Sequence, residues 1–330
     1  MQILRTASEL GKLPPGCVLT IGNFDGVHLG HQQILQTAYI RARQENTPLV
    51  AMTFDPHPVA ILHPEKAPGV LTPLQFKAHL IQRYGVDYLI VLRDSASLLR
   101  LTPDEFVDKF LLKDVKPIAL IEGDDFHFGS GRSGTVDTLK EMAKTYGFEV
   151  IVILPIPALL STGQSIRVSS TTIRYMLQAG HVADAAVLLG RPYRLIGQVV
   201  SGRGQGRRIG YPTLNMQNPS QIIPQEGVYA GYVRLGQTED DVSALNGRMD
   251  AVFSVGRVRT FGEEYPLFIE AHLVDPKTSN LSGKWMAMDF VERIRPQEKF
   301  KSVKLLAEQI ARDCVTAKNI LAVNNTKGTI

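Results

Sequence analysis

The sequence contains only two cysteines, Cys17 and Cys314, at opposite ends of its 330 residues. They form no C-x-x-C pair, which argues against a disulfide framework and a structural zinc site. The longest apolar run, residues 150–160, is interrupted by Pro155 and Pro157 and is shorter than the roughly 18 residues of a membrane span. The N-terminal residues contain no apolar signal-peptide core. We therefore expect a soluble, cytoplasmic protein with no membrane partner.

Extremes of composition are also missing. The chain is 44% hydrophobic and 21% charged, which is ordinary for a globular protein and excludes a disordered one. Its length exceeds the roughly 100–200 residues of one domain, so two domains are expected. The net charge of +4 and pI of about 9.0 are compatible with nucleic acid, phosphorylated small molecules or neither. The basic excess lies in residues 191–330, which carry 19 basic and 14 acidic side chains.

Short aliphatic runs alternate with helical patterns in residues 1–190. Buried strands are predicted at 18–21, 50–54, 88–92, 118–121 and 150–154. Thr102 and Glu105 form a capping-box pattern with Pro103 at the first helical position, and a helix at 136–146 is ended by Gly147. This alternation predicts an α/β, doubly wound parallel sheet that binds ligands at the carboxyl ends of its strands.

The pattern changes in residues 191–330. Strands separated by turn residues are predicted at 193–200, 228–235, 250–255, 267–274 and 285–294, which is typical of a small antiparallel β-barrel. Residues 302–322 return to helical spacing, with Leu306, Ile310 and Cys314 on one stripe. We expect this C-terminal helix to cover the barrel. The predicted domains are therefore residues 1–190 and 191–330.

A glycine-containing turn joins the first predicted strand to a helix in residues 19–31, LTIGNFDGVHLGH. Gly22 and Gly26 allow close approach of the backbone, and the helix start offers N–H groups to an anion. His28 and His31 are three residues apart and share one helix face. The pattern favours a site for a polyphosphate. A metal site, weakened by the lack of a third ligand at zinc-like spacing, and hydrogen-bonded turn histidines are the alternatives.

The run GNFDGVHLGH resembles the adenylyltransferase signature of the bacterial bifunctional riboflavin kinase and FMN adenylyltransferase family, the prokaryotic FAD synthetases. TFDPHP at 53–58, LTP at 71–73, GDDFHFGSGRSG at 123–134 and VSSTTIR at 168–174 follow in the order typical of that family. The resemblance covers nearly the whole chain. It implies a nucleotidyltransferase-like sheet domain, an FMN adenylyltransferase, followed by a riboflavin kinase-like barrel domain.

The resemblance also implies roles for residues of the first domain. The implied catalytic residues are His28 and His31. The implied contacts to the ATP phosphates are Gly22, Asn23, Phe24, Arg167, Ser170, Thr171 and Arg174. The implied flavin contacts are Asp124, Phe126 and Phe128, the two aromatic rings being suited to stacking on a flavin. Taken alone, Ser169 and Ser170 would cap a helix, and the two phenylalanines would pack in a core. Because His127 replaces the Arg of other family members, no contact is transferred to it.

Residues 202–215, GRGQGRRIGYPTLN, are glycine-rich and basic. Their backbone amides can wrap phosphates, and Thr213 and Asn215 offer neutral oxygens to Mg²⁺; a flexible basic loop is an equal alternative. The run resembles the riboflavin kinase signature of the same family. It implies phosphate contacts by Gly202, Gly206 and Arg207 and Mg²⁺ ligation by Thr213 and Asn215. Leu214 and Gln205 replace the usual Ala and Arg.

Glu270 lies in a predicted strand on the face opposite to Ile269 and Ala271. The resemblance implies that Glu270 is a catalytic base, which takes the proton of the riboflavin ribityl hydroxyl as it attacks the γ-phosphate of ATP. An exposed strand glutamate is the commoner role for such a residue. Ser254 and Val258 depart from the family pattern, which makes kinase activity less certain than adenylyl transfer.

Three functions follow, in order of preference. The first is FAD biosynthesis: riboflavin is phosphorylated to FMN with ATP, and FMN is adenylylated to FAD with release of pyrophosphate, with Mg²⁺ as cofactor. The alternative is an FMN adenylyltransferase whose barrel binds flavin with weak or no kinase activity. Nucleic-acid binding through Arg203, Arg207 and Arg208 ranks last because no aromatic-interleaved basic stripe is present, and we expect no nucleic-acid partner. The oligomeric state is left open.

Overall fold

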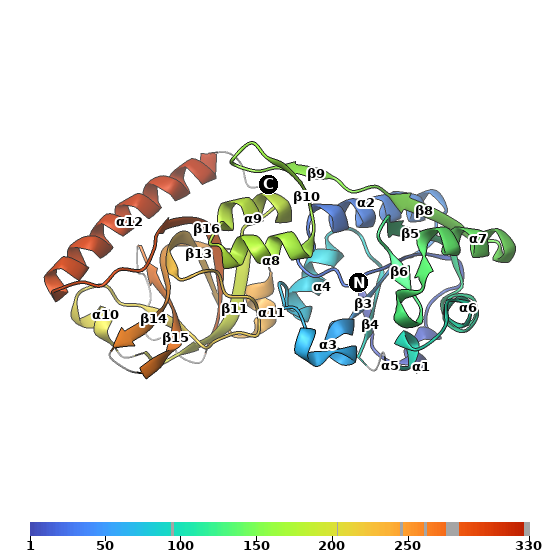
Figure 1. The fold of residues 1–330 in the computed structure, drawn as a ribbon, viewed down its shortest axis with the longest axis horizontal. Coiled ribbons are helices and arrows are strands. Elements are labelled where there is room, and N and C mark those ends of the chain that lie inside the picture. Colours follow the sequence, from blue (N-terminus) through green and yellow to red (C-terminus); the bar gives the residue numbers. More distant parts are fainter. Residues whose placement is uncertain (94–95, 203, 245–246, 261–262, 275–283, 327–330) are drawn as a thin grey trace. The chain divides into compact units, whose positions relative to one another are not determined.

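The computed structural model describes residues 1–93, 96–202, 204–244, 247–260, 263–274 and 284–326. Arg203 lies outside this description, as do the side chains of Gln205 and Val258. The chain forms two compact units (Figure 1): Met1–Pro68 with Lys77–Pro157, and Gly69–Phe76 with Ala158–Ile330. The short segment Gly69–Phe76 thus belongs to the second unit. The assignment of one activity to residues 1–190 and the other to 191–330 stays a prediction.

Six strands form the sheet of the first unit, in the order β1-β4-β3-β2-β5-β8. They are β1 Gln2–Leu4, β2 Cys17–Ile21, β3 Leu49–Phe54, β4 Tyr88–Leu92, β5 Pro117–Gly123 and β8 Glu149–Ile153. Every neighbouring pair is parallel, which confirms the predicted sheet. Strand β2 is buried along its whole length, as its continuous aliphatic sequence requires. The three-residue edge strand β1 was not predicted.

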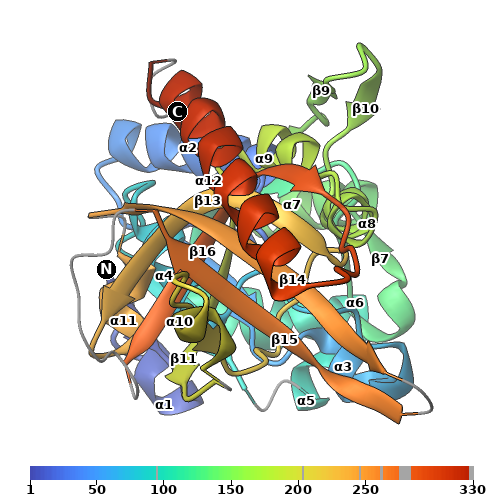
Figure 2. The same ribbon diagram turned by 90° about the vertical axis from the view of Figure 1, so that its left-hand side faces the viewer.

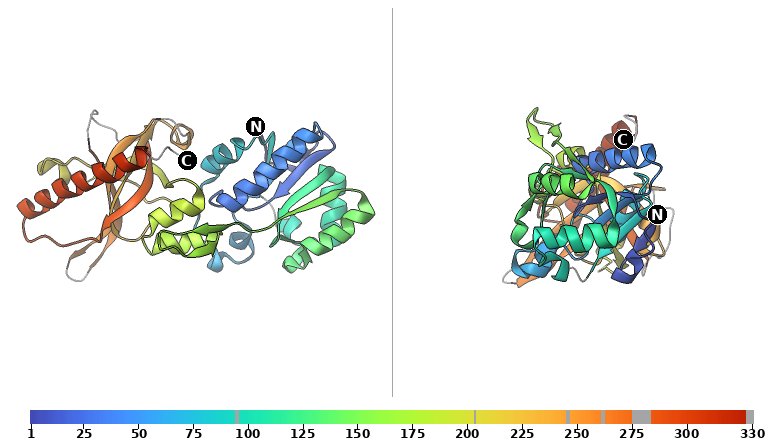
Figure 3. Two further views of the ribbon diagram at one scale, coloured as in Figure 1. Left: turned by 90° about the horizontal axis from the view of Figure 1, so that it is seen from above. Right: turned by 90° about the vertical axis from the view of Figure 1, so that its right-hand side faces the viewer.

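Helices connect these strands. They are α1 Ala7–Leu10, α2 Leu29–Gln44, α3 Pro58–Leu62, η1 Pro64–Lys66, α4 Leu74–Gln82, α5 Ala96–Leu99, α6 Pro103–Glu105, the π-helix η2 Phe106–Val115 and α7 Val136–Tyr146. The predicted capping box is present, because Thr102 Oγ1 accepts the Glu105 N–H and Glu105 Oε2 accepts the Thr102 N–H. Helix α7 ends at Gly147 with φ 79°, as predicted. Helix α2, blue in Figure 3, packs against β2, β3 and β5.

Short elements complete the first unit and lead into the second. They are β6 His127–Phe128, η3 Ser130–Arg132, β7 Gly134–Thr135, β9 Pro157–Leu159, β10 Ser165–Arg167, α8 Ser170–Gln178 and α9 Val182–Leu189. Helix α8 is capped by Ser169, whose Oγ accepts the Thr172 N–H at 3.1 Å. No helix among the described residues is long and apolar enough to cross a membrane.

A closed antiparallel barrel forms the core of the second unit, in the order β11-β12-β15-β14-β13-β16. Its strands are β11 Tyr193–Val200, β12 Leu214–Met216, β13 Gly227–Gly236, β14 Met249–Thr260, β15 Glu263–Leu273 and β16 Trp285–Arg295. Two short helices, α10 Gln205–Arg208 and α11 Glu239–Ser243, lie between strands. Buried rings of Tyr229, Phe253 and Phe290 pack together. The predicted barrel is confirmed, with β12 as the strand that the sequence did not reveal.

Helix α12, Val303–Thr326, lies against β13, β14 and β16 (Figure 2), which confirms that the C-terminal helix covers the barrel. Ala317 and Leu321 are fully buried there with Val228, Ala230 and Val252. The helix is also held by an ion pair of Arg295 with Asp313, whose carboxylate is 3% exposed. Of the predicted stripe, Cys314 packs against this cluster.

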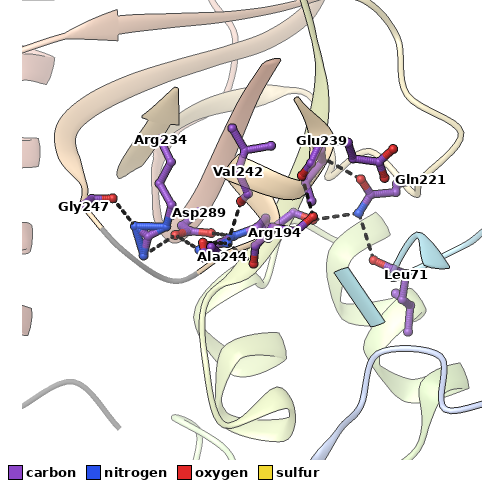
Figure 4. A network of polar contacts seen from close by, with 11 residues as sticks. Leu71, Arg194, Gln221, Arg234, Glu239, Val242, Ala244, Gly247 and Asp289 are labelled. Carbon is purple, nitrogen blue, oxygen red and sulfur yellow. Dashed lines mark hydrogen bonds and ion pairs between the residues drawn. The ribbon is translucent and has the colours of Figure 1, made fainter. Parts of the chain in front are cut away.

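A buried polar network holds one end of the barrel (Figure 4). Arg194 binds both oxygens of Asp289, at 2.6 and 2.8 Å, and Arg234 lies 3.3 Å from the same carboxylate. Gln221 Nε2 donates to the carbonyl oxygens of Arg194 and Leu71, at 2.7 and 3.0 Å. Because buried charges require partners, this network fixes the strand ends and also attaches the segment Gly69–Phe76 to the barrel.

Candidate active sites

The loop between β2 and α2 carries the first predicted site. The Gly22 N–H continues the sheet by donating to Met52 O at 3.0 Å. The chain then turns through two non-glycine residues with positive φ, Phe24 at 45° and Val27 at 40°, on either side of Gly26 at 89°. A positive φ is unfavourable for a β-branched residue such as Val27, so surrounding contacts must hold the loop in this shape.

His28 and His31 come together at the start of α2. His28 is the N-cap residue, and its Nδ1 accepts the His31 N–H at 3.3 Å. The neutral His28 ring therefore carries its proton on Nε2. The two imidazoles are stacked, with centroids 3.6 Å apart and planes inclined by 14°. The predicted shared face is thus present, and it presents two ring edges beside the N–H groups of the first helical turn.

A buried lysine lies beneath this loop. Lys77 is 6% exposed, and its Nζ donates to Asn23 O at 2.8 Å; the hydroxyl of Thr53 donates to the same oxygen at 3.0 Å. Burial lowers the pKa of Lys77, while the carboxylates of Asp25 and Asp55 act in the opposite direction. Lys77 is not among the predicted site residues.

Glu122 is a second buried residue that the sequence analysis missed. It lies on β5 with 1% exposure, and its Oε1 accepts the Ile21 N–H at 2.8 Å, where β2 ends. Burial raises the pKa of Glu122 well above its ordinary value, although the bond from Ile21 lowers it. The carboxyl group thus replaces a backbone acceptor immediately before the Gly22 turn.

The predicted flavin contacts follow β5. Asp124 is exposed, and its N–H donates to Ile153 O at 3.2 Å. The Phe126 and Phe128 rings stack at 5.9 Å, and Phe128, 5% exposed, also packs on Phe106. Phe128 is therefore part of the hydrophobic core, whereas Phe126 is half-buried and Asp124 borders solvent. Their contact with a flavin stays a prediction.

Four predicted phosphate contacts lie in the second unit. Arg167 ends β10 and is exposed, Ser170 and Thr171 form the first turn of α8, and the Arg174 Nε donates to Gly69 O at 2.8 Å. Their hydroxyl and guanidinium groups suit a phosphate, and the N-terminus of α8 favours an anion. These four contacts also stay predictions.

The glycine loop of the barrel folds against the Pro-Thr-Leu-Asn run. A Cβ at Gly202 would overlap the Asn215 amide, and one at Gly206 would overlap the Tyr211 carbonyl oxygen and lie 3.4 Å from Thr213 Oγ1. Glycine is therefore required at position 206, where the neighbouring atom belongs to the backbone, whereas a side chain at position 202 would displace the Asn215 amide. Arg207 lies in the short helix α10 within the loop and is exposed.

Strand register brings the second set of site residues together. Asn215 on β12 is the cross-strand partner of Glu270 on β15, and Glu270 in turn pairs with Ser254 on β14. Directly paired residues point to the same face of a sheet, so an amide, a carboxylate and a hydroxyl form one row. Glu270 is half-buried, while Ile269 and Ala271 are buried on the opposite face, as predicted.

The Ser254 side chain also contacts Gln297, which follows β16. Gln297 Nε2 donates to Ser254 Oγ at 2.9 Å, to Val255 O at 3.1 Å and to Gly227 O at 3.2 Å. An amide side chain therefore reaches the position where the family pattern carries Asn, although it comes from another part of the chain. Sequence order gave no signal for this contact.

The site residues suit a magnesium ion bound together with phosphates. Thr213 and Asn215 supply neutral oxygens, Glu270 supplies a carboxylate beside Asn215, and the close approach of Gly202 and Gly206 leaves backbone amides near them. Mg²⁺ binds such sets of few protein oxygens, completed by phosphate and water. No group of three His, Cys, Asp or Glu side chains that would hold a metal alone occurs in the described ranges.

Comparisons with known proteins cover both units. Residues 11–172 match the family model of FAD synthetase, and residues 189–321 match that of riboflavin kinase. The bifunctional riboflavin kinase/FMN adenylyltransferase of Escherichia coli strain K12 is 36% identical over 325 residues, 98% of this chain and 99% of that protein. The Bacillus subtilis protein of the same name is 35% identical over 301 residues, 90% of each chain. A crystal structure named Macrolide-efflux Protein from Streptococcus pneumoniae is similar at a TM-score of 0.83 and 30% identity, covering 97% and 99% of the two chains.

Proposed function

This chain belongs to the bacterial bifunctional riboflavin kinase/FMN adenylyltransferase family, and from that membership we propose that it makes FAD in two steps. In the first step riboflavin is phosphorylated to FMN with ATP. In the second, FMN is adenylylated to FAD with release of pyrophosphate. The observation that carries the proposal is that residues 11–172 match the FAD synthetase model and residues 189–321 match the riboflavin kinase model. Each match contains one loop that we propose binds phosphates, residues 22–31 and 202–215.

Adenylyl transfer is assigned to the loop before α2. An oxygen of the FMN phosphate attacks the α-phosphorus of ATP, and the bond to the β-phosphate oxygen breaks. Negative charge then builds on the departing pyrophosphate. The stacked imidazoles of His28 and His31 and the N–H groups of the α2 N-terminus stabilise that charge, so catalysis relies on positioning and electrostatics without a covalent intermediate.

Riboflavin phosphorylation is assigned to the row of residues on β12, β15 and β14. The Glu270 carboxylate accepts the proton of the riboflavin hydroxyl as its oxygen attacks the γ-phosphorus of ATP, and ADP leaves. Thr213 and Asn215 hold a Mg²⁺ ion, which neutralises phosphate charge when bound. Gly202, Gly206 and Arg207 present amides and one positive charge to the same phosphates.

A barrel with weak or no kinase activity is not favoured. The family model of riboflavin kinase covers the barrel, and both curated relatives described above are named for two activities. The Gln297 amide donates to Ser254 Oγ, so the serine that departs from the family pattern is held by a side-chain contact, and the row keeps the Asn215 amide. The proposal further includes a cytoplasmic location and no nucleic-acid or membrane partner.

One comparison of substrates tests both steps. The purified protein is incubated with ATP and Mg²⁺ and either riboflavin or FMN, and flavin products are separated by chromatography. We expect FMN followed by FAD from riboflavin, and FAD directly from FMN. Chelation of Mg²⁺ by EDTA should stop FMN formation. Production of FAD from FMN without any product from riboflavin would reject the kinase step, and no product from either flavin would reject the whole proposal.

A further inference from the structure

Lys77 is a buried ionisable residue of the first unit to which the proposed mechanism gives no role. It lies on α4 and is 6% exposed, whereas surface lysines such as Lys66 are exposed. Placing an ammonium group in a protein interior is costly unless it is held by polar partners. The chemistry proposed for the loop before α2 does not require a lysine there, so the contacts of Lys77 must show what it does.

Those contacts converge on one backbone atom. Lys77 Nζ donates to the carbonyl oxygen of Asn23 at 2.8 Å, and Thr53 Oγ1 donates to the same oxygen at 3.0 Å. Lys77 Nζ also lies 3.4 Å from Thr53 Oγ1, so the three groups form a closed triangle. Asn23 is the second residue of the run GNFDGVHLGH, one residue before Phe24 with its positive φ.

The position of the Asn23 carbonyl group determines the direction of the Phe24 N–H, because both belong to one peptide bond. The peptide bond between Asn23 and Phe24 is planar, and it is not the cis bond of the described chain, which joins Asp55 to Pro56. In a trans peptide the C=O and N–H bonds point in opposite directions. Because Lys77 and Thr53 draw the Asn23 oxygen inward, the Phe24 N–H points away from them.

We propose that Lys77 is a positioning residue for adenylyl transfer: with Thr53 it holds the Asn23 carbonyl so that the Phe24 N–H is presented to the nucleotide phosphates. The inference rests on the proposed function of the loop. It explains how the positive φ of Phe24 is maintained, since two donors on the Asn23 oxygen prevent the Asn23–Phe24 peptide from rotating. A rotated peptide would direct a carbonyl oxygen at the phosphates.

The principal test is Lys77→Met, measured by steady-state kinetics of FAD formation from FMN. Loss or misplacement of one donor to developing charge costs about 10²-fold in rate, so we expect kcat to fall by about that factor while KM for ATP changes less than about threefold. Lys77→Arg keeps the charge and donors and should recover part of kcat. Lys66→Met, a surface lysine of the same unit, is the matched control and should leave kcat unchanged.

A double-mutant cycle separates positioning from folding. Thr53→Val removes the other donor to Asn23 O at nearly constant volume, and we expect kcat to fall by about tenfold. Because both donors act on one atom, the double variant should be no more than about threefold worse than Lys77→Met alone. Thermal unfolding of each variant, followed by circular dichroism, reports whether the first unit is folded, and FMN formation from riboflavin, which uses the other unit, is the internal activity control.

The outcomes distinguish this inference from the function on which it rests. If the unaltered protein makes no FAD from FMN, the proposed function fails first. If it does, and Lys77→Met retains kcat within about twofold while FMN formation is intact, Lys77 has no positioning role. If Lys77→Met lowers both activities together, the Thr53→Val variant distinguishes the two explanations. An unchanged kcat of Thr53→Val for FAD formation would overturn the positioning role, and a fall in FAD formation with normal FMN formation would support it.

Discussion

The two loops proposed to bind phosphates are held in shape by different means. The loop at residues 22–31 precedes a long helix, and its shape is held from beneath by Lys77 and Thr53. The loop at residues 202–215 contains only the four-residue helix α10, and its shape depends on glycines that lie against Asn215 and Tyr211. Hydrogen bonds from two side chains thus hold the first loop, whereas the second loop packs closely because its glycines have no side chain.

This difference predicts which substitutions each loop tolerates. A Cβ at Gly22 would come no closer than 3.3 Å to the Phe24 ring, a contact that a small movement of the ring relieves. Cβ atoms at Gly202 and Gly206 would overlap Asn215 and a backbone oxygen. The first loop should therefore respond mainly to changes at its polar side chains, and the second to a Cβ added at Gly202 or Gly206.

The largest expected effect separates the two activities at Glu270. Glu270→Ala removes the proposed base, which contributes typically 10²–10⁴-fold, so FMN formation from riboflavin should fall by about that range. FAD formation from added FMN should stay unchanged because that reaction uses the first loop. Chromatography of both reactions measures the split, and Glu292→Ala, on the exposed side of β16, is a suitable control. Equal loss of both activities would contradict separate sites.

The converse separation is expected at His28. His28→Asn keeps a side-chain acceptor for the His31 N–H, so the cap of α2 is retained while the imidazole is lost. FAD formation should fall by about 10²-fold with FMN formation unaffected. His63→Asn, which changes an exposed histidine of the same unit, should alter neither. A variant of His28 with normal FAD formation would remove the stacked pair from the mechanism.

Two matched glycine substitutions test the difference between the loops directly. Gly206→Ala should lower FMN formation by about tenfold, because the added methyl group displaces the Tyr211 carbonyl and moves Thr213 and Asn215 with it. FAD formation from FMN serves as the internal control. Normal kinase activity in Gly206→Ala would show that the barrel loop does not need its close packing.

The smallest effect is expected for the partner substitution in the first loop. Gly22→Ala should lower FAD formation by less than about threefold, since neither a positive φ nor an overlap opposes the methyl group. Both alanine variants are compared by their melting temperatures as well as their rates. A larger loss of activity in Gly22→Ala than in Gly206→Ala would contradict the conclusion that close packing of glycines matters more in the second loop.

The sequence predicted the architecture well where its signals were long. The buried strands were found because continuous aliphatic runs suit parallel strands, and α12 because its apolar stripe spans several turns. Strands β1 and β12, with three residues each, were too short to give a period. β12 matters most, because its register places Asn215 opposite Glu270. The sequence motifs identified both residues but did not indicate that they are neighbours.

The residues that support the sites were harder to predict. In LQFKAHLIQ, Lys77 lies on the apolar face of the helix, opposite to Gln75 and His79, which is a signal of burial. Its partners Asn23 and Thr53 are distant in sequence, so the sequence does not show what Lys77 binds. Gln297 and Glu122 gave no signal, since their roles depend on which strands become neighbours.

The segment Gly69–Phe76 has a practical consequence for dissecting this protein. It packs with the barrel unit although sequence on both sides of it belongs to the other unit. Within it, the Leu71 carbonyl oxygen accepts a hydrogen bond from Gln221. The Phe76 ring centroid lies 4.9 Å from the Arg194 guanidinium carbon and 5.5 Å from that of Arg191. The Leu71 and Phe76 side chains are almost fully buried, and each contributes about 1.5–3 kcal/mol.

A single cut in the chain therefore cannot yield two complete halves. A fragment beginning at residue 158 or 191 lacks these eight residues, leaves the Gln221 amide short of an acceptor and exposes the surface that Phe76 covers. Kinase activity measured on such a fragment would be lower than the activity of the barrel in the full chain. To be tested in isolation, the barrel needs residues 69–76 supplied as a peptide or joined through a new linker, in the manner of a circular permutation.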